Sequence, residues 1–355
     1  MGLFEDVLKG DESLIRNENA LDYEFLPKLL PYREQEQKYL ATCIKPLFQQ
    51  RSGRNLFVHG PPGIGKTAAA RFVLRELEEE TDEIYPLYIN CWQHNTTYKV
   101  LLEICEQVGY KFTQNKKTTE LFDVVQRIVN KGAAVFVLDE IDKAEDFDFL
   151  YFVLEEIFHK TIFLITNYKS WLVELDERIK SRLTPEMVEF KQYTASETKG
   201  ILRERIDYAF PPGAWDDKAF DMVVQKTATL KDIRSGLFLM RESALQAEEQ
   251  SKKKIGPDDV EKAIRKLDDF TVKNSAELAA DEQLILKTVK ANPESRIGEL
   301  YKHYKKAGGA ASYKTFQRKI KKLEEGKFLT VEKTMGGTEG NTTIVRQASK
   351  KLTDY

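Results

Sequence analysis

The sequence feature that most constrains the fold is a phosphate-binding loop with a predicted strand before it and a predicted helix after it. The loop matches the pattern G-x-x-x-x-G-K-[ST] with Gly60, Pro61, Pro62, Gly63, Ile64, Gly65, Lys66 and Thr67. The apolar run 56–59 predicts the strand, and the run 68–74 predicts the helix. Backbone N–H groups of such a loop bind phosphate oxygens, the lysine reaches the β- and γ-phosphates, and the threonine hydroxyl ligates Mg²⁺. The motif therefore predicts an α/β fold that binds a nucleoside triphosphate.

Two further apolar runs predict strands that end in polar residues. The run 134–138 is continuous, as in a strand buried on both faces of a parallel sheet, and it leads into Asp139 and Glu140. A carboxylate at the carboxyl end of such a strand lies near the phosphate loop, so Asp139 is predicted to hold Mg²⁺ and Glu140 to polarise the attacking water. The run 161–166 leads into Asn167, which either hydrogen-bonds the γ-phosphate or that water, or simply ends the strand. Together these runs indicate an ATPase core.

Two arginines that follow the third run are candidates for stabilising charge on a transferred phosphoryl group. Arg178 and Arg182 both lie in the segment 176–183. A guanidinium group is suited to the negative charge that spreads over a phosphoryl group during transfer. An exposed, solvated arginine is the alternative interpretation of each.

The C-terminal part of the chain differs from the rest in charge and in pattern. Residues 281–355 carry 16 Lys and Arg against 9 Asp and Glu, whereas residues 1–280 carry 39 against 48. The patterns predict three helices and then a hairpin with a glycine-rich tip, over 281–291, 295–307, 312–325, 328–333 and 342–346. Three helices followed by a hairpin form a winged helix, which lays its third helix in the major groove of DNA.

The third of these helices has two predicted faces. An apolar face is predicted from the helical spacing of Tyr313, Phe316, Ile320 and Leu323. Lysines on the other side would contact phosphates, and Gln317 and Arg318 are the better candidates for base edges. The candidate DNA-binding residues of the module are Lys314, Gln317, Arg318, Lys321, Lys322, Lys333 and Arg346. A solvated amphipathic helix is the alternative, and Glu339 at the tip of the hairpin would repel phosphates.

In this order the motifs resemble those of the AAA+ ATPases and, more closely, those of the archaeal origin-recognition initiators of the Orc–Cdc type, over nearly the whole chain. The segment 30–34, with Tyr32 and Arg33, resembles the LPHRE segment of the family, which packs near the adenine. The segment from about 92 to 130 resembles the initiator-specific insertion, which contacts DNA in the family, with helices near 97–108 and 118–130. The resemblance implies ATP or ADP, with Mg²⁺, as the bound nucleotide.

The same resemblance implies roles for single residues. Asn167 matches sensor 1, and Arg234 matches the sensor 2 residue of the lid, which meets the γ-phosphate. Arg182 matches the arginine finger of many relatives, and Arg178 is the rival position. Lys231 stands where the family has a glycine.

The expected organisation is an AAA+ P-loop parallel-sheet domain at 1–190, a small helical lid domain at 191–275 and a C-terminal winged-helix domain at 276–355, with a polar connector at about 268–280. No apolar run reaches the roughly 18 residues of a membrane span, and the acidic N-terminus lacks the apolar core of a signal peptide. The expected location is therefore the cytoplasm, at the nucleoid. The three scattered cysteines are expected to be buried thiols.

The predicted function is that of an ATP-dependent DNA replication initiator, with ATP binding and slow hydrolysis as the switch. Such a protein would bind double-stranded origin DNA and help recruit the replicative MCM helicase; other initiator subunits are further candidate partners, and no membrane partner is expected. A DNA motor of the Holliday-junction type is one alternative, although it lacks the 92–130 insertion. The other is a DNA regulator that keeps ATP without hydrolysing it, against which Glu140, Asn167 and Arg234 argue.

Overall fold

The computed structural model of the 355-residue chain describes residues 13–276, 279–293, 295–325, 328–334 and 342–347. It divides into two compact units, which are described separately. The nucleotide unit comprises the described residues up to 214 together with 220–241. The C-terminal unit comprises 215–219 and the described residues from 242 onward.

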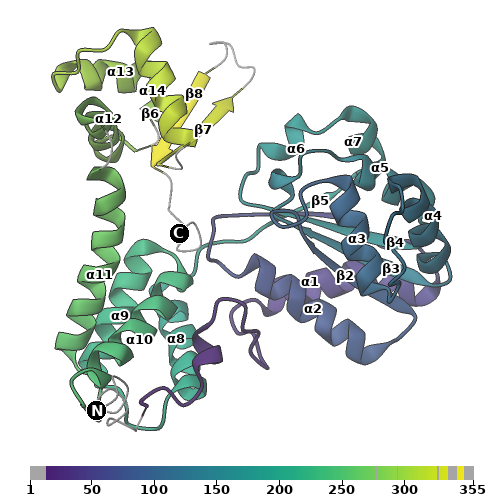
Figure 1. The fold of residues 1–355 in the computed structure, drawn as a ribbon, viewed down its shortest axis with the longest axis horizontal. Coiled ribbons are helices and arrows are strands. Elements are labelled where there is room, and N and C mark those ends of the chain that lie inside the picture. The colour runs from purple at the N-terminus through teal and green to yellow at the C-terminus, as the bar shows by residue number, and fades with distance from the viewer. Residues whose placement is uncertain (1–12, 277–278, 294, 326–327, 335–341, 348–355) are drawn as a thin grey trace. The chain divides into compact units, whose positions relative to one another are not determined.

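A five-stranded parallel sheet forms the centre of the nucleotide unit (Figure 1). Its strands are β1 (Leu56–His59), β2 (Ile84–Asn90), β3 (Ala133–Asp139), β4 (Lys160–Thr166) and β5 (Glu186–Glu189), in the spatial order β2-β3-β4-β1-β5. Every residue of β1 and β3 is buried, because helices cover both faces of the sheet. This arrangement explains the continuous apolar runs and confirms the predicted parallel sheet.

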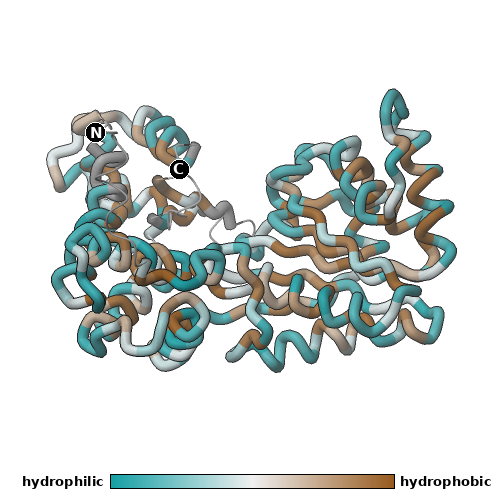
Figure 2. The backbone as a smooth tube through the Cα atoms, turned by 60° about the horizontal axis from the view of Figure 1, so that its bottom comes forward, coloured by the Kyte–Doolittle hydropathy of each residue, from teal (hydrophilic) through white to brown (hydrophobic). Residues whose placement is uncertain are grey.

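Helices on the two faces of the sheet enclose two separate apolar cores. One core lies against α1 and α2, and the other lies against α3, α4, α5 and α7. Alternate residues of β3 supply them: Val135 and Val137 point into the first, whereas Phe136 and Leu138 point into the second. The strands accordingly form the brown, apolar centre of this unit in Figure 2.

The helices of the nucleotide unit agree with most of the predicted elements. Those around the sheet are η1 (Glu18–Leu21), α1 (Glu34–Ile44), η2 (Lys45–Gln49), α2 (Lys66–Glu80), α3 (Thr97–Gln107), α4 (Thr118–Val129), η3 (Ile141–Lys143), α5 (Asp148–Glu156), α6 (Trp171–Glu174) and α7 (Glu177–Leu183). The helices α3 and α4 confirm the two that were expected within 92–130. Along the chain the sheet is followed by α8 (Ala195–Ala209) in this unit, by α9 (Asp217–Leu230) and α10 (Ile233–Glu248), each with residues in both units, and by α11 (Pro257–Ala276) in the C-terminal unit.

The polar connector expected at about 268–280 is helical for most of its length. The helix α11 continues to Ala276, and α12 begins at Ala280. Leu267, the residue before this stretch, is buried in α11. The polar composition of this stretch therefore does not mark a break in the helix before Ala276.

The C-terminal unit ends in the predicted winged helix. Its elements are α12 (Ala280–Ala291), β6 (Ser295–Arg296), α13 (Ile297–Lys306), α14 (Tyr313–Glu325), β7 (Leu329–Thr334) and β8 (Thr342–Gln347), and the three strands form an antiparallel sheet in the order β6-β8-β7. Phe316, Ile320 and Leu323 are buried as predicted. Tyr313 is 39% exposed, so it lies at the edge of this apolar face, with its ring against Tyr301 at 5.0 Å. The hairpin tip with Glu339 lies outside the described residues.

Lys231, between α9 and α10, has a left-handed backbone with φ of 58°. For a residue with a Cβ this conformation costs about 1–2 kcal/mol, part of which glycine avoids. We expect Lys231→Gly to raise the free energy of unfolding by about 1 kcal/mol, measured by denaturant titration. The matched change Lys38→Gly, in the interior of α1, should lower it by about 1 kcal/mol. A loss of stability in both variants would contradict the expectation.

Candidate nucleotide site and nucleic-acid interface

The phosphate loop runs from the end of β1 to the start of α2, where the sequence placed it. Gly65 is the last residue before α2 and has a φ of 88°, in the left-handed region that favours glycine. A Cβ at this position would lie 2.5 Å from the hydroxyl oxygen of Tyr193, so a larger residue would also displace that side chain. The loop therefore has the glycine-dependent backbone and the helix N-terminus that a bound phosphate needs, and it fits a nucleotide.

The side chain of Lys66 is buried and lies over this loop. Its Nζ donates hydrogen bonds to the carbonyl oxygens of Gly60 and Pro61, both at 2.8 Å, and to Oδ1 of Asn167 at 2.9 Å. Asn167 stands at the end of β4, next to β1 in the sheet. The sensor residue predicted from sequence is thus in direct contact with the lysine of the phosphate loop.

Asp139 lies at the centre of a hydrogen-bond cluster beside the loop. Its Oδ2 accepts from Thr67 Oγ1 at 2.6 Å and from the Tyr88 hydroxyl at 2.8 Å, and its Oδ1 accepts from the backbone N–H of Glu140 at 2.9 Å. Burial raises the pKa of Asp139, while the hydrogen bonds from Thr67 and Tyr88 act in the opposite direction. A hydroxyl and a carboxylate in contact beside a phosphate loop are a suitable oxygen ligand set for Mg²⁺.

Glu140 adopts an uncommon backbone conformation directly after this carboxylate. Its φ is 51°, a left-handed value that a non-glycine residue adopts only under local constraint. One constraint is visible, since Asn167 Nδ2 donates to Glu140 Oε2 at 3.1 Å. Lys66, Asn167 and Glu140 therefore form a continuous chain of side chains, which brings together three of the predicted site residues.

The turn that carries Arg234 touches the phosphate loop. The Asp232 side chain packs against Gly63, where a Cβ would lie 2.0 Å from Asp232 Oδ1, and the backbone N–H of Ile233 lies 3.4 Å from the carbonyl oxygen of Gly63. Oδ1 of Asp232 also accepts from the backbone N–H of Arg234 at 2.9 Å. Arg234 is half-buried at the first turn of α10, so the structure places this predicted sensor on the element that meets the loop.

Arg33 supports the phosphate loop through hydrogen bonds to a backbone carbonyl of the loop. It is only 4% exposed, and its Nε and Nη2 donate to the carbonyl oxygen of Ile64 at 3.1 and 3.0 Å. Nη2 also donates to the Lys191 carbonyl at 2.6 Å, and the guanidinium group stacks on Tyr193 at 3.9 Å. These contacts make Arg33 a support for the loop, whereas Tyr32 remains partly exposed beside it.

The two arginine-finger candidates bind acidic side chains on the surface. Arg178 forms a two-point hydrogen bond with Asp176, at 3.2 and 3.1 Å, and its side chain is 78% exposed. Arg182 binds Glu155 and lies over the Tyr151 ring at 5.3 Å. Both stand on α7, and their role in phosphoryl transfer remains a prediction.

Sequence analysis assigned no role to three residues of this site. Tyr88 and Tyr193 lie outside the motifs, and a tyrosine in a strand or a loop carries no signal for a partner far along the chain. Asp232 was detectable, because it belongs to the same segment as Arg234 and an Asp before a helix often hydrogen-bonds its first N–H groups.

The three cysteines, Cys43, Cys91 and Cys105, are buried free thiols, as expected.

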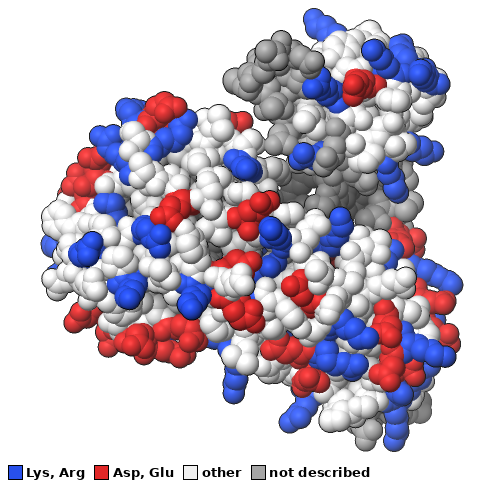
Figure 3. Space-filling view, turned by 180° about the vertical axis from the view of Figure 1, so that it is seen from behind, with Lys and Arg blue, Asp and Glu red and all other residues white. Residues whose placement is uncertain are grey.

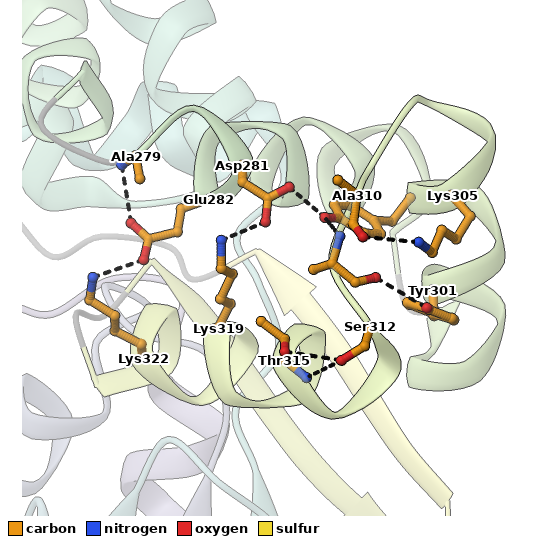
Figure 4. A network of polar contacts seen from close by, with 12 residues as sticks. Ala279, Asp281, Glu282, Tyr301, Lys305, Ala310, Ser312, Thr315, Lys319 and Lys322 are labelled. Carbon is orange, nitrogen blue, oxygen red and sulfur yellow. Dashed lines mark hydrogen bonds and ion pairs between the residues drawn. The ribbon is translucent and has the colours of Figure 1, made fainter.

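Three faces run along α14, and the predicted DNA-binding residues of this helix lie on two of them. The first faces the core with Phe316, Ile320 and Leu323. The second faces α12, where Lys319 binds Asp281 at 2.5 Å and Lys322 binds Glu282 at 2.8 Å (Figure 4). The third face is exposed and carries Lys314, Gln317, Arg318 and Lys321, which we call the basic stripe.

Lys322 forms one of these ion pairs, and its side chain is 68% exposed. Hydrogen bonds from Lys319 and from Lys322 lower the pKa of Asp281 and of Glu282, so both carboxylates remain charged partners at neutral pH. Arg346 is exposed on β8, and Lys333 lies on β7. On the face shown in Figure 3, most of the charged side chains on the described surface of the winged helix are Lys and Arg.

A search of the described helices finds none that combines the length and the apolar character needed to cross a lipid bilayer.

Comparison with known proteins agrees with this architecture. Residues 49–166 match the AAA domain family, and residues 199–265 match the Cdc6 AAA+ ATPase-type lid domain. The chain is 30% identical to the ORC1-type DNA replication protein 2 of Archaeoglobus fulgidus, over 94% of this chain and 92% of that protein. It is 27% identical to the ORC1-type DNA replication protein 2 of Methanothermobacter thermautotrophicus, over 96% and 93%. The structure of the Aeropyrum pernix ORC1 protein in complex with DNA is similar with a TM-score of 0.68 and 26% identity, over 96% of each chain. The nucleotide site, the lid and the winged helix thus have relatives in one group, and the chain belongs to the family of the ORC1-type DNA replication proteins, which are AAA+ ATPases.

Proposed function

We propose that this protein initiates DNA replication by binding origin DNA in a manner controlled by ATP. The observation that carries the proposal is the contact between Gly63 of the phosphate loop and the turn of Asp232 and Ile233. Because Arg234 follows on the same turn, a nucleotide at the loop would bear directly on the start of α10. Binding energy at the loop could in this way favour one arrangement of the lid.

The residues around the loop have distinct roles in this proposal. Loop N–H groups and Lys66 bind the phosphates, and Thr67 with Asp139 would hold Mg²⁺, which supplies positive charge at the phosphate oxygens. Glu140 orients and polarises the attacking water, and Asn167 fixes the Glu140 carboxylate through the observed 3.1 Å hydrogen bond. Hydrolysis is slow and resets the switch, and a neighbouring subunit or the same chain supplies the arginine finger from Arg182 or Arg178.

The basic stripe of α14 supplies the DNA contact. Its exposed lysines neutralise phosphates, and Gln317 and Arg318 reach base edges in the major groove. The similar ORC1 protein of Aeropyrum pernix has been solved in complex with DNA, which supports DNA binding as such. The protein would then help recruit the replicative MCM helicase, together with other initiator subunits.

The decisive experiment is genome-wide mapping of the protein on the chromosome of its own cell. We expect enrichment at the few loci where read depth in growing cells shows that replication begins. The matched control is Lys66→Ala, which should lose this enrichment because Lys66 contacts the loop and Asn167. Binding spread evenly over the chromosome, or enrichment at recombination intermediates alone, would overturn the proposal and favour the motor of the Holliday-junction type.

A further inference from the structure

Tyr88 connects the carboxylate of Asp139, the proposed Mg²⁺ ligand, with the helix α3. Its hydroxyl donates to Asp139 Oδ2 at 2.8 Å, and the same oxygen accepts from Thr67 Oγ1 at 2.6 Å. One donor comes from α2 and the other from β2, so the carboxylate group is fixed from two elements. The Arg71 guanidinium lies over the Tyr88 ring at 5.5 Å and helps hold the ring in place.

The backbone of Tyr88 is held in turn by Gln107, the last residue of α3. β2 is an edge strand of the sheet, and an edge strand leaves backbone N–H and C=O groups without a neighbouring strand. At Tyr88 the Gln107 amide fills both positions: its Oε1 accepts from the Tyr88 N–H at 2.9 Å, and its Nε2 donates to the Tyr88 carbonyl at 2.6 Å. The Gln107 side chain therefore substitutes for a neighbouring strand at this one residue.

We propose that Tyr88 is a positioning residue that sets the orientation of the Asp139 carboxylate for Mg²⁺, and that Gln107 links this orientation to the 92–130 segment. The inference rests on the proposed function, in which Thr67 and Asp139 hold the metal ion. Residues that hydrogen-bond a metal-binding carboxylate orient it, and their loss typically weakens metal affinity about 10–100-fold. A partner that binds α3 would be linked to the Asp139 carboxylate through only two side chains, those of Gln107 and Tyr88.

The test compares nucleotide binding with and without the metal ion. A fluorescent ADP analogue is titrated into Tyr88→Phe in EDTA and then at increasing Mg²⁺ concentration. We expect unchanged binding in EDTA and an increase of about tenfold in the Mg²⁺ concentration for half-maximal enhancement. The control is Tyr85→Phe, which removes a hydroxyl from the same strand and should match the unchanged protein in both conditions.

The outcomes separate this inference from the proposed function. An unaltered Mg²⁺ dependence of Tyr88→Phe overturns the positioning role, and so does an equal loss in EDTA and in Mg²⁺, which would mark Tyr88 as part of the scaffold alone. If Mg²⁺ does not strengthen ADP binding even in the unchanged protein, the proposed metal site fails instead.

The link to α3 has its own test in a double-mutant cycle. Gln107→Ala should raise the half-maximal Mg²⁺ concentration by about two- to fivefold, because Tyr88 loses its backbone support. In the Tyr88→Phe background it should add nothing, since no hydroxyl remains to be positioned. The control, Gln126→Ala, removes an amide from α4 that contacts Glu156 and should have no effect. Independent effects of Tyr88→Phe and Gln107→Ala would overturn the link.

Discussion

Replacing Glu140 with Gln is expected to lower the rate of ATP hydrolysis by about 10²- to 10⁴-fold and to leave nucleotide binding almost unchanged. Gln has the size of Glu and still offers an oxygen to the Asn167 Nδ2 that lies 3.1 Å from Glu140 Oε2. What the variant loses is the negative charge that polarises the attacking water. The loop contacts of Lys66 do not involve Glu140 directly, so phosphate binding should persist.

Single-turnover release of phosphate measures the hydrolysis step, and titration with a fluorescent ATP analogue measures binding. Glu174→Gln is the matched control, because it neutralises an exposed carboxylate of α6 in the same unit. Equal hydrolysis rates in Glu140→Gln and the unchanged protein would support the regulator that holds ATP without using it. A loss of binding that matches the loss of rate would place Glu140 in the binding of nucleotide rather than in the chemistry.

Local patterns predicted the parts of this fold that depend on burial. The continuous apolar run at 134–138 specified a strand buried on both faces, and the spacing of Phe316, Ile320 and Leu323 specified the core face of α14. The glycine-rich loop predicted its own backbone, because the left-handed φ of 88° at Gly65 favours glycine. In each case the physical constraint lies within a few residues of sequence.

The missed features depend on partners far along the chain. Arg33 was expected from the resemblance to lie near the adenine, and the carbonyl groups that it binds are 31 and 158 residues away along the chain. No local pattern distinguishes an arginine that binds a ligand from one that binds such carbonyls. The same holds for Tyr88, whose partner Asp139 is 51 residues away. The helical spacing places Lys322 on the same side of α14 as the basic stripe. Its ion pair with Glu282, 40 residues away, is visible only in the structure.

The second large expected effect is a loss of DNA affinity when a residue of the basic stripe is replaced. Arg318→Ala is expected to weaken binding to double-stranded DNA by about 1–3 kcal/mol, or about 5- to 150-fold. Arg318 is exposed on the stripe, and a guanidinium there can make a two-point contact with a guanine or a phosphate. The slope of log affinity against log salt should also fall by about one for each phosphate contact that is lost.

Lys322→Ala is the matched control for this prediction. It removes the same charge from the same helix, but the ammonium group it removes is bound to the buried Glu282 at 2.8 Å. We therefore expect little change in DNA affinity or in the salt slope, and a loss of about 1 kcal/mol in the free energy of unfolding. Fluorescence anisotropy on one DNA duplex over a salt series measures the first two quantities, and denaturant titration measures the third. If Lys322→Ala weakened DNA binding as strongly as Arg318→Ala, the DNA would have to reach the side of α14 that faces α12, and the assignment of the basic stripe would be wrong.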